Sequence, residues 1–180
     1  MQDYLAYYDL EGYLFKVVGP RFQEEGSLGA FDLFSIVIWK ANRAKAHFAR
    51  RLLKRGNDLE RAARLMTRAL HDATAVRERL RILIEDWDLR LPMASAILSA
   101  LWPEEFSIYD VRVCGQLGGF KSLGDRSRFE QLWDEYQEYL RAVCEAALAH
   151  IALRDKDRWL WGRSAAQQLE ADIARAFKER

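Results

Sequence analysis

Residues 91–113 read LPMASAILSALWPEEFSIYDVRV, and this stretch decides the fold that we expect. Its first half predicts a short apolar helix that has Pro92 in its first turn and ends near Leu101. A turn with a second proline follows, and Asp110 then begins another helix. Apolar residues flank Asp110 on both sides, and a carboxylate is costly to bury in such surroundings unless it has partners or a task. Asp110 is therefore the best single candidate for chemistry in this chain.

Length and composition favour one folded domain. The chain has 180 residues, half of them hydrophobic, and six are Trp, so it can bury a core and disorder is not expected. We therefore expect a single helical domain over residues 1–180. The net charge is +1, so any nucleic-acid site must come from local clustering of basic residues.

The cysteines and the N-terminal residues favour a cytoplasmic protein. Cys114 and Cys144 lie in apolar helical patterns, so we expect both to be reduced residues of the core. No apolar run approaches the roughly 18–20 residues of a membrane span, so no membrane partner is expected. Asp3, Asp9 and Glu11 precede any apolar run, a pattern that a signal peptide does not have.

Apolar residues recur every three or four positions along most of the chain, which predicts an all-α fold. Only residues 13–18, YLFKVV, could form a strand, and one strand makes no sheet. Capping signals set the expected helix ends. Asp32 and Gly56 mark the start and the end of a helix over about 34–52. Asn57 with Glu60 begins a helix that runs to about His71. Ser127 with Glu130 begins a helix to Ile151, which we expect to be the longest. Further helices are expected over about 74–84 and 155–178, and the short helix that Asp110 begins is broken by Gly115, Gly118 and Gly119.

Basic residues gather in one place. Residues 39–57 hold seven Lys or Arg and no acid: Lys40, Arg43, Lys45, Arg50, Arg51, Lys54 and Arg55. On one continuous helix, most of these lie together with His47 on a face about a third of a turn from the apolar stripe. A solvated helix face is one interpretation, but such a face usually mixes both signs. The other interpretation is an anionic partner, and a phosphate backbone is the commonest one.

Several common catalytic motifs are missing. There is no Walker loop, no usable GxGxxG, no HExxH, no CxxC and no GxSxG. The three histidines are isolated from one another and from the cysteines, so we expect no metal site and no cofactor. The sequence positions of the histidines are His47, His71 and His150.

The stretch LPMASAIL…FSIYDVRV resembles the catalytic segment of the helix-hairpin-helix DNA glycosylases, a superfamily of base-excision repair. In that family a hairpin is followed by a TAxxIL-like helix and by an apolar turn that ends in an aspartate at the start of a helix. The similar segment covers about residues 86–117, and weaker similarity touches most of the chain from about Phe31 to Ala165. The resemblance implies a compact all-α glycosylase fold with Asp110 as the catalytic residue.

Two weaker matches imply further site residues. The stretch IVIWKANRAKA resembles the early family helix from which a residue wedges into the duplex behind the extruded nucleotide. The matching position is Lys40, and Asn42 lies close by. The stretch RDKDRWLWGRSA resembles the late family helix that packs beside the catalytic aspartate, where Asp157 and Trp161 lie four residues apart and share a face.

The other candidates would line a base pocket or contact DNA. We expect Trp39, Tyr109, Asp157 and Trp161 in the base pocket, and core packing is the alternative for each aromatic residue. The residues expected to contact DNA are Lys40, Asn42, Arg43, Arg50, Arg51, Arg90 and Arg112. An ion pair with an acid is the alternative for Arg112, and a place on a basic helix face is the alternative for Lys40.

Three features depart from the family pattern. The Schiff-base lysine of the lyase members falls on Pro92, and a proline cannot form an imine, so a monofunctional enzyme is implied. The hairpin glycines, which let backbone amides approach a phosphate, fall on Asp88 and Arg90. Arg90 could replace that contact with a charge-assisted one. The iron–sulfur cysteines of some members are absent, so no cluster is expected.

The chemistry of base excision explains why an aspartate would be needed. Cleavage of an N-glycosidic bond builds positive charge on the sugar in an oxocarbenium-like transition state. A carboxylate at the anomeric face stabilises that charge and can orient or deprotonate water. A helix N-terminus favours the charged form of Asp110, which suits this role. A plain N-cap without catalytic function is the alternative.

Three hypotheses follow. The first is a monomeric, monofunctional DNA glycosylase that flips a damaged or modified base out of double-stranded DNA and leaves an abasic site. Alkylated or oxidised purines fit the family, and so do hypermodified bases of phage DNA, which would make the protein an antiviral defence enzyme. The second is a non-catalytic helical DNA-binding or protein-interaction module of the same fold, best supported by the altered hairpin. The third is a structural helical protein with no nucleic-acid partner.

Overall fold

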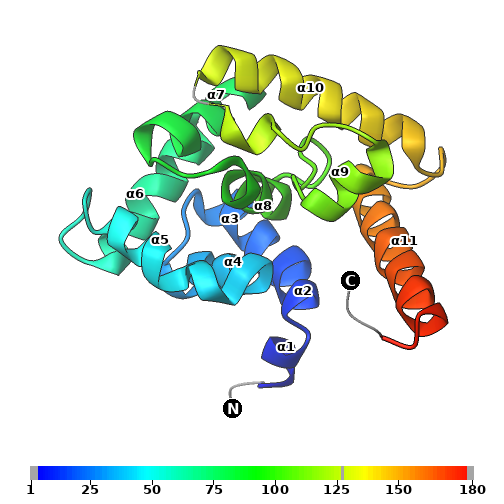
Figure 1. Ribbon diagram of the computed structural model, residues 1–180. Helices are drawn as coiled ribbons and strands as arrows, with labels where there is room; N and C mark the ends of the chain where they lie inside the picture. The colour runs from blue at the N-terminus through cyan, green and yellow to red at the C-terminus, as the bar shows by residue number, and fades with distance from the viewer. Residues whose placement is uncertain (1–3, 127, 178–180) are drawn as a thin grey trace. The chain divides into compact units, whose positions relative to one another are not determined.

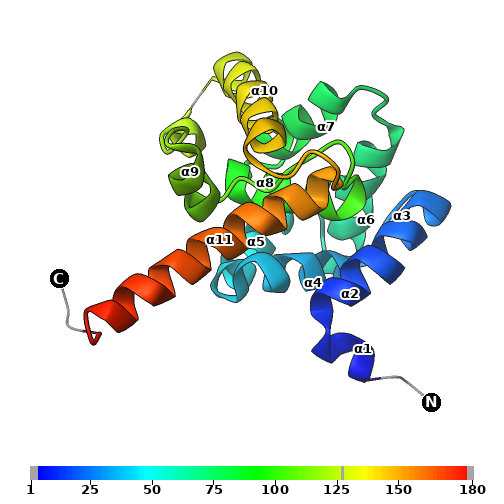
Figure 2. The ribbon, with the colours of Figure 1, turned by 90° about the vertical axis from the view of Figure 1, so that its right-hand side faces the viewer.

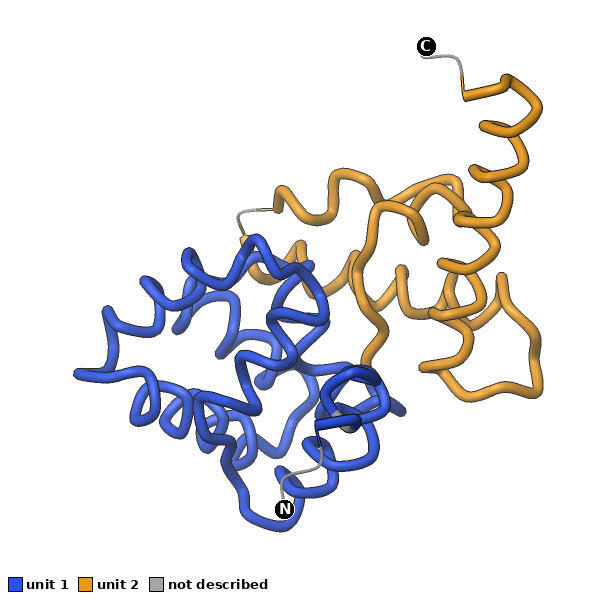
Figure 3. The backbone as a smooth tube through the Cα atoms, turned by 90° about the horizontal axis from the view of Figure 1, so that it is seen from below, with its two compact units in different colours: residues 1–105 blue, residues 106–180 orange. Residues whose placement is uncertain are grey.

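The computed structural model describes residues 4–126 and 128–177, and throughout these residues the regular elements are helices, without any strand (Figure 1). The expectation of an all-α protein is confirmed. The chain divides into two compact units, residues 1–105 and residues 106–180 (Figure 3). Two compact units can belong to one domain, so the single domain stays a prediction. In the part of the chain that the structure describes, no helix is both long and apolar enough to cross a membrane.

Unit 1 is built around one apolar helix. The helix α8 (Leu91–Leu101) packs against α3, α4, α7 and two π-helical segments, and it is buried almost all round from Ala94 to its end. Pro92 stands in its first turn, as the sequence predicts. The other helices of unit 1 are α1 (Leu5–Tyr8), α2 (Leu10–Tyr13), η1 (Leu14–Val18), α3 (Gly19–Glu25), α4 (Ala30–Ala41), η2 (Asn42–Ala44), α5 (Lys45–Leu52), α6 (Leu59–Asp72), α7 (Val76–Arg81) and η3 (Ile82–Asp86).

Among the described residues of unit 2, three α-helices and one short 3-10 helix are present. Its elements are α9 (Val111–Leu117), η4 (Leu123–Asp125), α10 (Phe129–Ala146) and α11 (Leu153–Ala174). α11 packs against α9 and α10, and Gln116 of α9 still donates a hydrogen bond to Gln167 at 2.9 Å, so only the last turns of α11 run clear of both helices (Figures 1 and 2). Gly118 takes the left-handed conformation that ends α9, with a φ of 72°, where glycine has no Cβ penalty.

The possible strand at residues 13–18 is a helix. Tyr13 ends α2, and the next five residues form the π-helical segment η1. Tyr13, Leu14 and Val18 are buried, so the apolar residues that resemble a strand in sequence share one face of a helix. Packing against α3, α4 and α8 thus outweighs the local preference of these residues for a strand.

The helix expected over residues 34–52 is broken. Ala41 leaves the helical region with φ −161° and ψ 87°, and η2 separates α4 from α5. The single helix face assumed for the basic residues therefore does not exist. Asp32 is not the N-cap, because α4 begins at Ala30 with Gly29 as its cap, and Asp32 therefore lies in the first turn of the helix. The last helix of this stretch ends at Leu52, before Gly56.

Other predicted boundaries also differ. Asp58, not Asn57, caps α6 by accepting a hydrogen bond from the Arg61 backbone N–H at 2.8 Å. Glu60 instead accepts a hydrogen bond from the Ala30 backbone N–H at 2.7 Å, so the expected capping box does not form. The helix expected over residues 74–84 begins at Val76 and continues as η3.

The C-terminal half brings further corrections. α10 has 18 residues and ends before the expected Ile151, so α11 with 22 residues is the longer helix. Ser127, expected to cap α10, lies outside the described residues. Cys114 is buried as expected, but Cys144 is exposed near the end of α10, and neither is in a disulfide.

The buried carboxylate of Asp32 is bound by two residues of earlier helices. The Tyr13 hydroxyl donates to its Oδ1 at 2.6 Å, and the Arg21 guanidinium donates to its Oδ2 at 2.7 Å. Burial, together with the hydrogen bond to Asp32 and the charge of Asp32, raises the pKa of Tyr13 to about 12. The network joins α2, α3 and α4 within unit 1.

We expect this tyrosine to make unit 1 sensitive to alkali. The pKa of Tyr13 rises from 10.0 to about 12 on folding, so the unfolded chain gives up this proton first. The stabilisation is complete below pH 10 and is lost as the pH rises towards 12. Urea unfolding should show a larger loss of unfolding free energy over that range in the wild type than in Tyr13→Phe. Equal losses of unfolding free energy in the two proteins would contradict the assignment of the alkaline loss to Tyr13.

Candidate active site and nucleic-acid interface

Asp110 caps α9, as the sequence predicts. Its backbone is extended, with φ −141° and ψ 138°, and its Oδ1 accepts a hydrogen bond from the Arg112 backbone N–H at 2.9 Å. Ile108 and Tyr109 before it are buried, whereas Val111 after it is exposed. Asp110 itself is partly exposed. The carboxylate thus stands where the chain leaves the interior of unit 2.

Two tyrosines of α10 hold the segment that leads to Asp110. The Tyr136 hydroxyl donates to the Ser107 carbonyl oxygen at 2.6 Å, and the Tyr139 hydroxyl donates to the Ile108 carbonyl oxygen at 2.7 Å. Burial raises the pKa of both hydroxyls, which keeps them protonated as donors. The backbone just before Asp110 is therefore fixed by buried hydrogen bonds. The sequence singles out neither tyrosine for this task, because each bonds a carbonyl about thirty positions away.

Tyr109 fixes the other side of this segment. Its hydroxyl lies 2.9 Å from the carbonyl oxygens of Phe120 and Lys121, and it accepts a hydrogen bond from the Gly124 N–H at 3.2 Å. Its ring packs edge-on against Tyr139, with 5.7 Å between ring centroids. These contacts tie the loop after α9 to the residue that precedes Asp110. Tyr109, predicted to line a base pocket, lies in the interior of unit 2.

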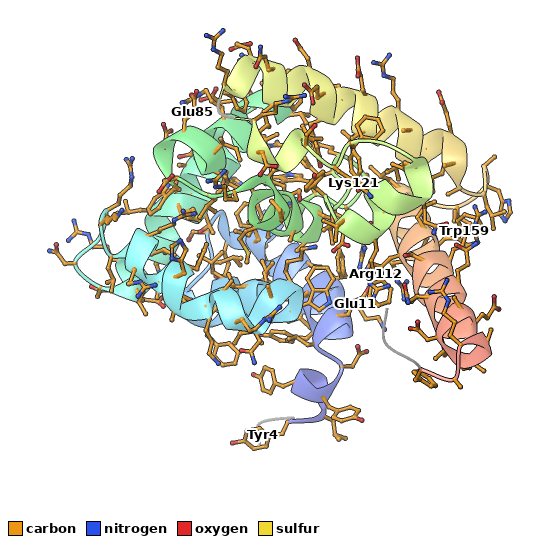
Figure 4. The ribbon with its side chains drawn as sticks, viewed as in Figure 1. Tyr4, Glu11, Glu85, Arg112, Lys121 and Trp159 are labelled. Carbon is orange, nitrogen blue, oxygen red and sulfur yellow. The ribbon has the colours of Figure 1, made fainter. Side chains whose placement is uncertain are left out.

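The side chain of Arg112, two residues after Asp110, contacts Trp161. The Arg112 guanidinium is 5.4 Å from the centroid of the Trp161 ring, within the range of a cation–π contact. Arg112 comes from α9 and Trp161 from α11, and Figure 4 shows Arg112 between these two helices. The Trp161 side chain is 47 % exposed. A positive charge and a partly exposed aromatic ring therefore lie together between α9 and α11.

The other base-pocket candidates are placed differently. Asp157 is only 3 % exposed, and the Arg154 guanidinium donates to its Oδ2 at 2.6 Å. The Trp39 ring is half-buried in unit 1 and packs edge-on against Phe15, with 5.7 Å between centroids. Of the four predicted residues, Trp161 exposes the largest share of its side chain, and Tyr109 and Asp157 lie inside unit 2.

The predicted DNA-contacting residues of α4 and α5 are on the surface of unit 1. Lys40 lies in the last turn of α4 and is partly exposed, and Arg43 is exposed in η2. Asn42 accepts a hydrogen bond from Lys45 Nζ at 2.9 Å. Arg50 is exposed on α5, with a guanidinium nitrogen 3.4 Å from His47 Nδ1. These residues belong to unit 1 and Asp110 belongs to unit 2.

Residues 87–90 form a turn between η3 and α8. The Leu89 N–H donates to the Leu83 carbonyl at 2.9 Å, and Trp87 and Leu89 are buried. Asp88 and Arg90 point the other way and are exposed. Asp88 has a φ of 52°, in the left-handed region that favours glycine. The turn therefore presents one negative and one positive side chain on a fixed backbone.

Two residues of the basic segment reach this turn. Arg51 Nε lies 3.5 Å from Asp88 Oδ2, and the Arg55 guanidinium lies 5.9 Å from the centroid of the Trp87 ring. The structure thus joins the basic segment and the hairpin position, which are separate features in the sequence. No local signal connects residues so far apart along the chain.

Comparisons with known proteins give no match, either to a protein-family model, or to a curated protein, or to a solved structure. Within residues 4–126 and 128–177, no group of three or more His, Cys, Asp or Glu side chains is arranged to hold a metal ion.

Proposed function

We propose that the protein is a monofunctional DNA glycosylase that hydrolyses the N-glycosidic bond of a damaged or modified base in double-stranded DNA. The observation that supports this most is the partly exposed Asp110 carboxylate, held at the N-terminus of α9, the helix from which Arg112 contacts Trp161. Negative charge is stabilised at a helix N-terminus by the macrodipole and by free N–H groups. The fixed backbone before Asp110 means that little reorganisation is needed when charge develops on a sugar.

The proposed reaction has two parts. The bond between C1′ and the base nitrogen breaks, its electron pair leaves with the base, and the sugar becomes an oxocarbenium ion that the Asp110 carboxylate stabilises. Water then adds to C1′, and its proton passes through Asp110 to the departing base or to solvent. The products are an abasic sugar and the free base. Pro92 stands where the lyase members of the resembled family have their lysine, so no imine forms and the strand stays intact.

The order of elements supports the resemblance to helix-hairpin-helix DNA glycosylases. A helix formed by α7 and η3 leads into the turn at residues 87–90, then into α8, and Asp110 begins the next helix. The turn residue Asp88 takes a glycine-type backbone conformation at a position where the resembled family has glycine. The left-handed backbone conformation at residue 88 is the one that a hairpin requires, and it forms here with an aspartate side chain.

The base must leave the duplex before C1′ can be reached. We assign Lys40 and Asn42 to the space that the nucleotide leaves, and Trp161 to the face on which the extruded base stacks. The phosphate backbone would be bound by Arg43, Arg50, Arg51, Arg90 and Arg112. Trp39 remains a candidate for the base pocket, whereas the buried Tyr109 and Asp157 support neighbouring residues of unit 2.

The substrate class follows from the exposure of this site. Trp161 and Arg112 are open to solvent, which leaves room for a base with a large substituent as well as for an alkylated or oxidised purine. Enlarged bases occur in phage DNA, so the proposal includes a role in antiviral defence. The proposed enzyme is a monomer that acts in the cytoplasm.

A strand-cleavage assay tests the proposed function. Duplexes with alkylated, oxidised or hypermodified bases are incubated with the protein and then heated in alkali, which breaks the strand at abasic sites. We expect breaks only after alkali, and no covalent adduct when borohydride is present. If no duplex of the panel breaks, the enzymatic proposal fails, and if borohydride traps an adduct, the monofunctional mechanism fails.

One observation favours a second candidate function. The hydrogen bond from the Arg112 N–H to Asp110 shows that this residue already has a structural task as an N-cap. In a non-catalytic DNA-binding or protein-interaction module, capping α9 would be the whole task of Asp110. Such a module would bind duplex DNA with a steep salt dependence but release no base.

A further inference from the structure

A surface pocket of about 450 Å³ lies in unit 1 and shares no residue with the site proposed for base excision. Pockets that bind small molecules commonly have volumes of roughly 300–1,000 Å³. The lining residues that carry side-chain chemistry for a ligand are Tyr7, Arg21, Glu25, Ser27, Phe31 and Arg64. Charges of both signs, a hydroxyl and two aromatic rings are therefore brought together from separate parts of the sequence.

Two arginines of the pocket are each held by one acid. Arg21 Nη1 donates a hydrogen bond to Asp32 Oδ2 at 2.7 Å. On α6, Arg64 Nε donates to Glu60 Oε1 at 2.9 Å, and its Nη2 lies 2.8 Å from the same oxygen. A guanidinium has five N–H donors, and these two side chains are 40 % and 51 % exposed, so both can still donate to a ligand. Donors of this kind favour a carboxylate.

Ser27 adds a hydroxyl to these donors. The residue is only 2 % exposed and lines the pocket, and its hydroxyl forms no hydrogen bond with another described residue. The adjacent Leu28 N–H donates to Thr67 Oγ1 at 2.8 Å, which fixes the backbone beside it. Burying a hydroxyl without a hydrogen bond costs free energy, so a ligand that supplies the missing partner is favoured.

The acids of the pocket outnumber its bases. The lining has two positive side chains and three negative ones, Glu25, Asp32 and Glu60, and so a net charge of −1. Asp32 and Glu60 are bound to the two arginines, whereas Glu25, exposed at the end of α3, forms no ion pair with another described residue. This excess disfavours a ligand with negative charge alone and favours one that also carries an ammonium group.

An aromatic surface borders these charges. Phe31 is 61 % exposed, and its ring packs edge-on against Tyr7, with 5.4 Å between ring centroids. The Tyr7 ring also packs edge-on against Tyr13, at 5.1 Å. Aromatic rings attract one another in such arrangements, so the ring of a ligand can extend this cluster at Phe31.

We propose that this pocket binds a free α-amino acid with an aromatic side chain. The ligand carboxylate accepts hydrogen bonds from Arg21, Arg64 and Ser27. Its ammonium group lies against Glu25, and its ring packs on Phe31. This binding site goes beyond base excision and is independent of it, because no residue of the pocket takes part in the proposed reaction.

Three probes of nearly equal size test the proposal in NMR titrations of the full chain. L-phenylalanine has both charged groups, 3-phenylpropionate lacks the ammonium group, and phenethylamine lacks the carboxylate. We expect saturable binding of L-phenylalanine with a Kd of about 1 mM or tighter, and binding of the other two about tenfold or more weaker. If L-phenylalanine does not bind, or if all three probes bind equally, the proposal is overturned.

Two variants with matched controls assign the charged groups. Glu25→Gln should weaken L-phenylalanine and phenethylamine about five- to tenfold and leave 3-phenylpropionate within about twofold. Arg64→Gln should weaken L-phenylalanine and 3-phenylpropionate by a similar factor and leave phenethylamine unchanged. The controls are Glu24→Gln and Arg68→Gln, which alter exposed residues of the same two helices outside the pocket.

Circular dichroism of all four variants checks that the fold is kept. Loss of affinity in the controls equal to that in Glu25→Gln and Arg64→Gln would overturn the proposal. Equal weakening of all three probes by Glu25→Gln and by Arg64→Gln would overturn it as well, because neither charge would then recognise its own group on the ligand.

Discussion

Asp110→Asn is expected to slow base excision by about 10²–10⁴-fold in a single-turnover assay. Asparagine is as good an N-cap as aspartate, so the bond to the Arg112 N–H and the start of α9 should survive. The negative charge that stabilises the oxocarbenium ion is lost. A large loss of rate with little change in the free energy of unfolding would therefore show that Asp110 has a catalytic role in addition to capping α9.

Asp58→Asn is the matched control for this experiment. Asp58 caps α6 through the Arg61 N–H at 2.8 Å, and Asp110 caps α9 through the Arg112 N–H at 2.9 Å. Both substitutions remove one charge from an N-cap. A rate for Asp110→Asn within about threefold of the Asp58→Asn rate, a difference below 1 kcal/mol in activation free energy, would leave Asp110 as a cap alone.

The second large effect concerns stability. We expect Asp157→Ala to lower the free energy of unfolding by about 3–5 kcal/mol, because the Arg154 guanidinium, with a side chain only 13 % exposed, loses its carboxylate partner. Urea unfolding near neutral pH measures the loss. A variant already unfolded without urea would be the extreme of the same result.

Asp155→Ala provides the comparison on the same helix. Asp155 also pairs with an arginine three residues away, at 2.9 Å, but both side chains are more than half exposed. Its removal should cost less than about 1 kcal/mol. Equal losses for the two variants would show that the Asp157 pair is not the stabilising contact that its burial indicates.

Local signals in the sequence predict the parts of the site that depend on neighbouring residues. Pro92 in the first turn of α8 and Asp110 at the start of α9 are both confirmed, because a fixed φ and a capping carboxylate act within one turn of helix. The all-α fold follows from the helical spacing of apolar residues over long stretches.

Contacts between distant residues explain the failures. Asp32 has the residue type of an N-cap, but Tyr13 and Arg21 bind its carboxylate inside unit 1. The buried tyrosine hydrogen bonds that fix residues 107 and 108 come from α10, about thirty positions away. The pairing of Arg51 with Asp88 likewise depends on how α5 meets the turn before α8.

Duplexes with a sugar analogue at one position test the central claim without knowledge of the excised base. One duplex carries a cationic pyrrolidine ring in place of the sugar, and the other carries a neutral tetrahydrofuran ring. We predict that the wild type binds the pyrrolidine duplex about 10²-fold or more tightly than the tetrahydrofuran duplex, as expected for a mimic of the transition state, and that Asp110→Asn loses this preference. Equal binding of the two duplexes by the wild type would contradict the account.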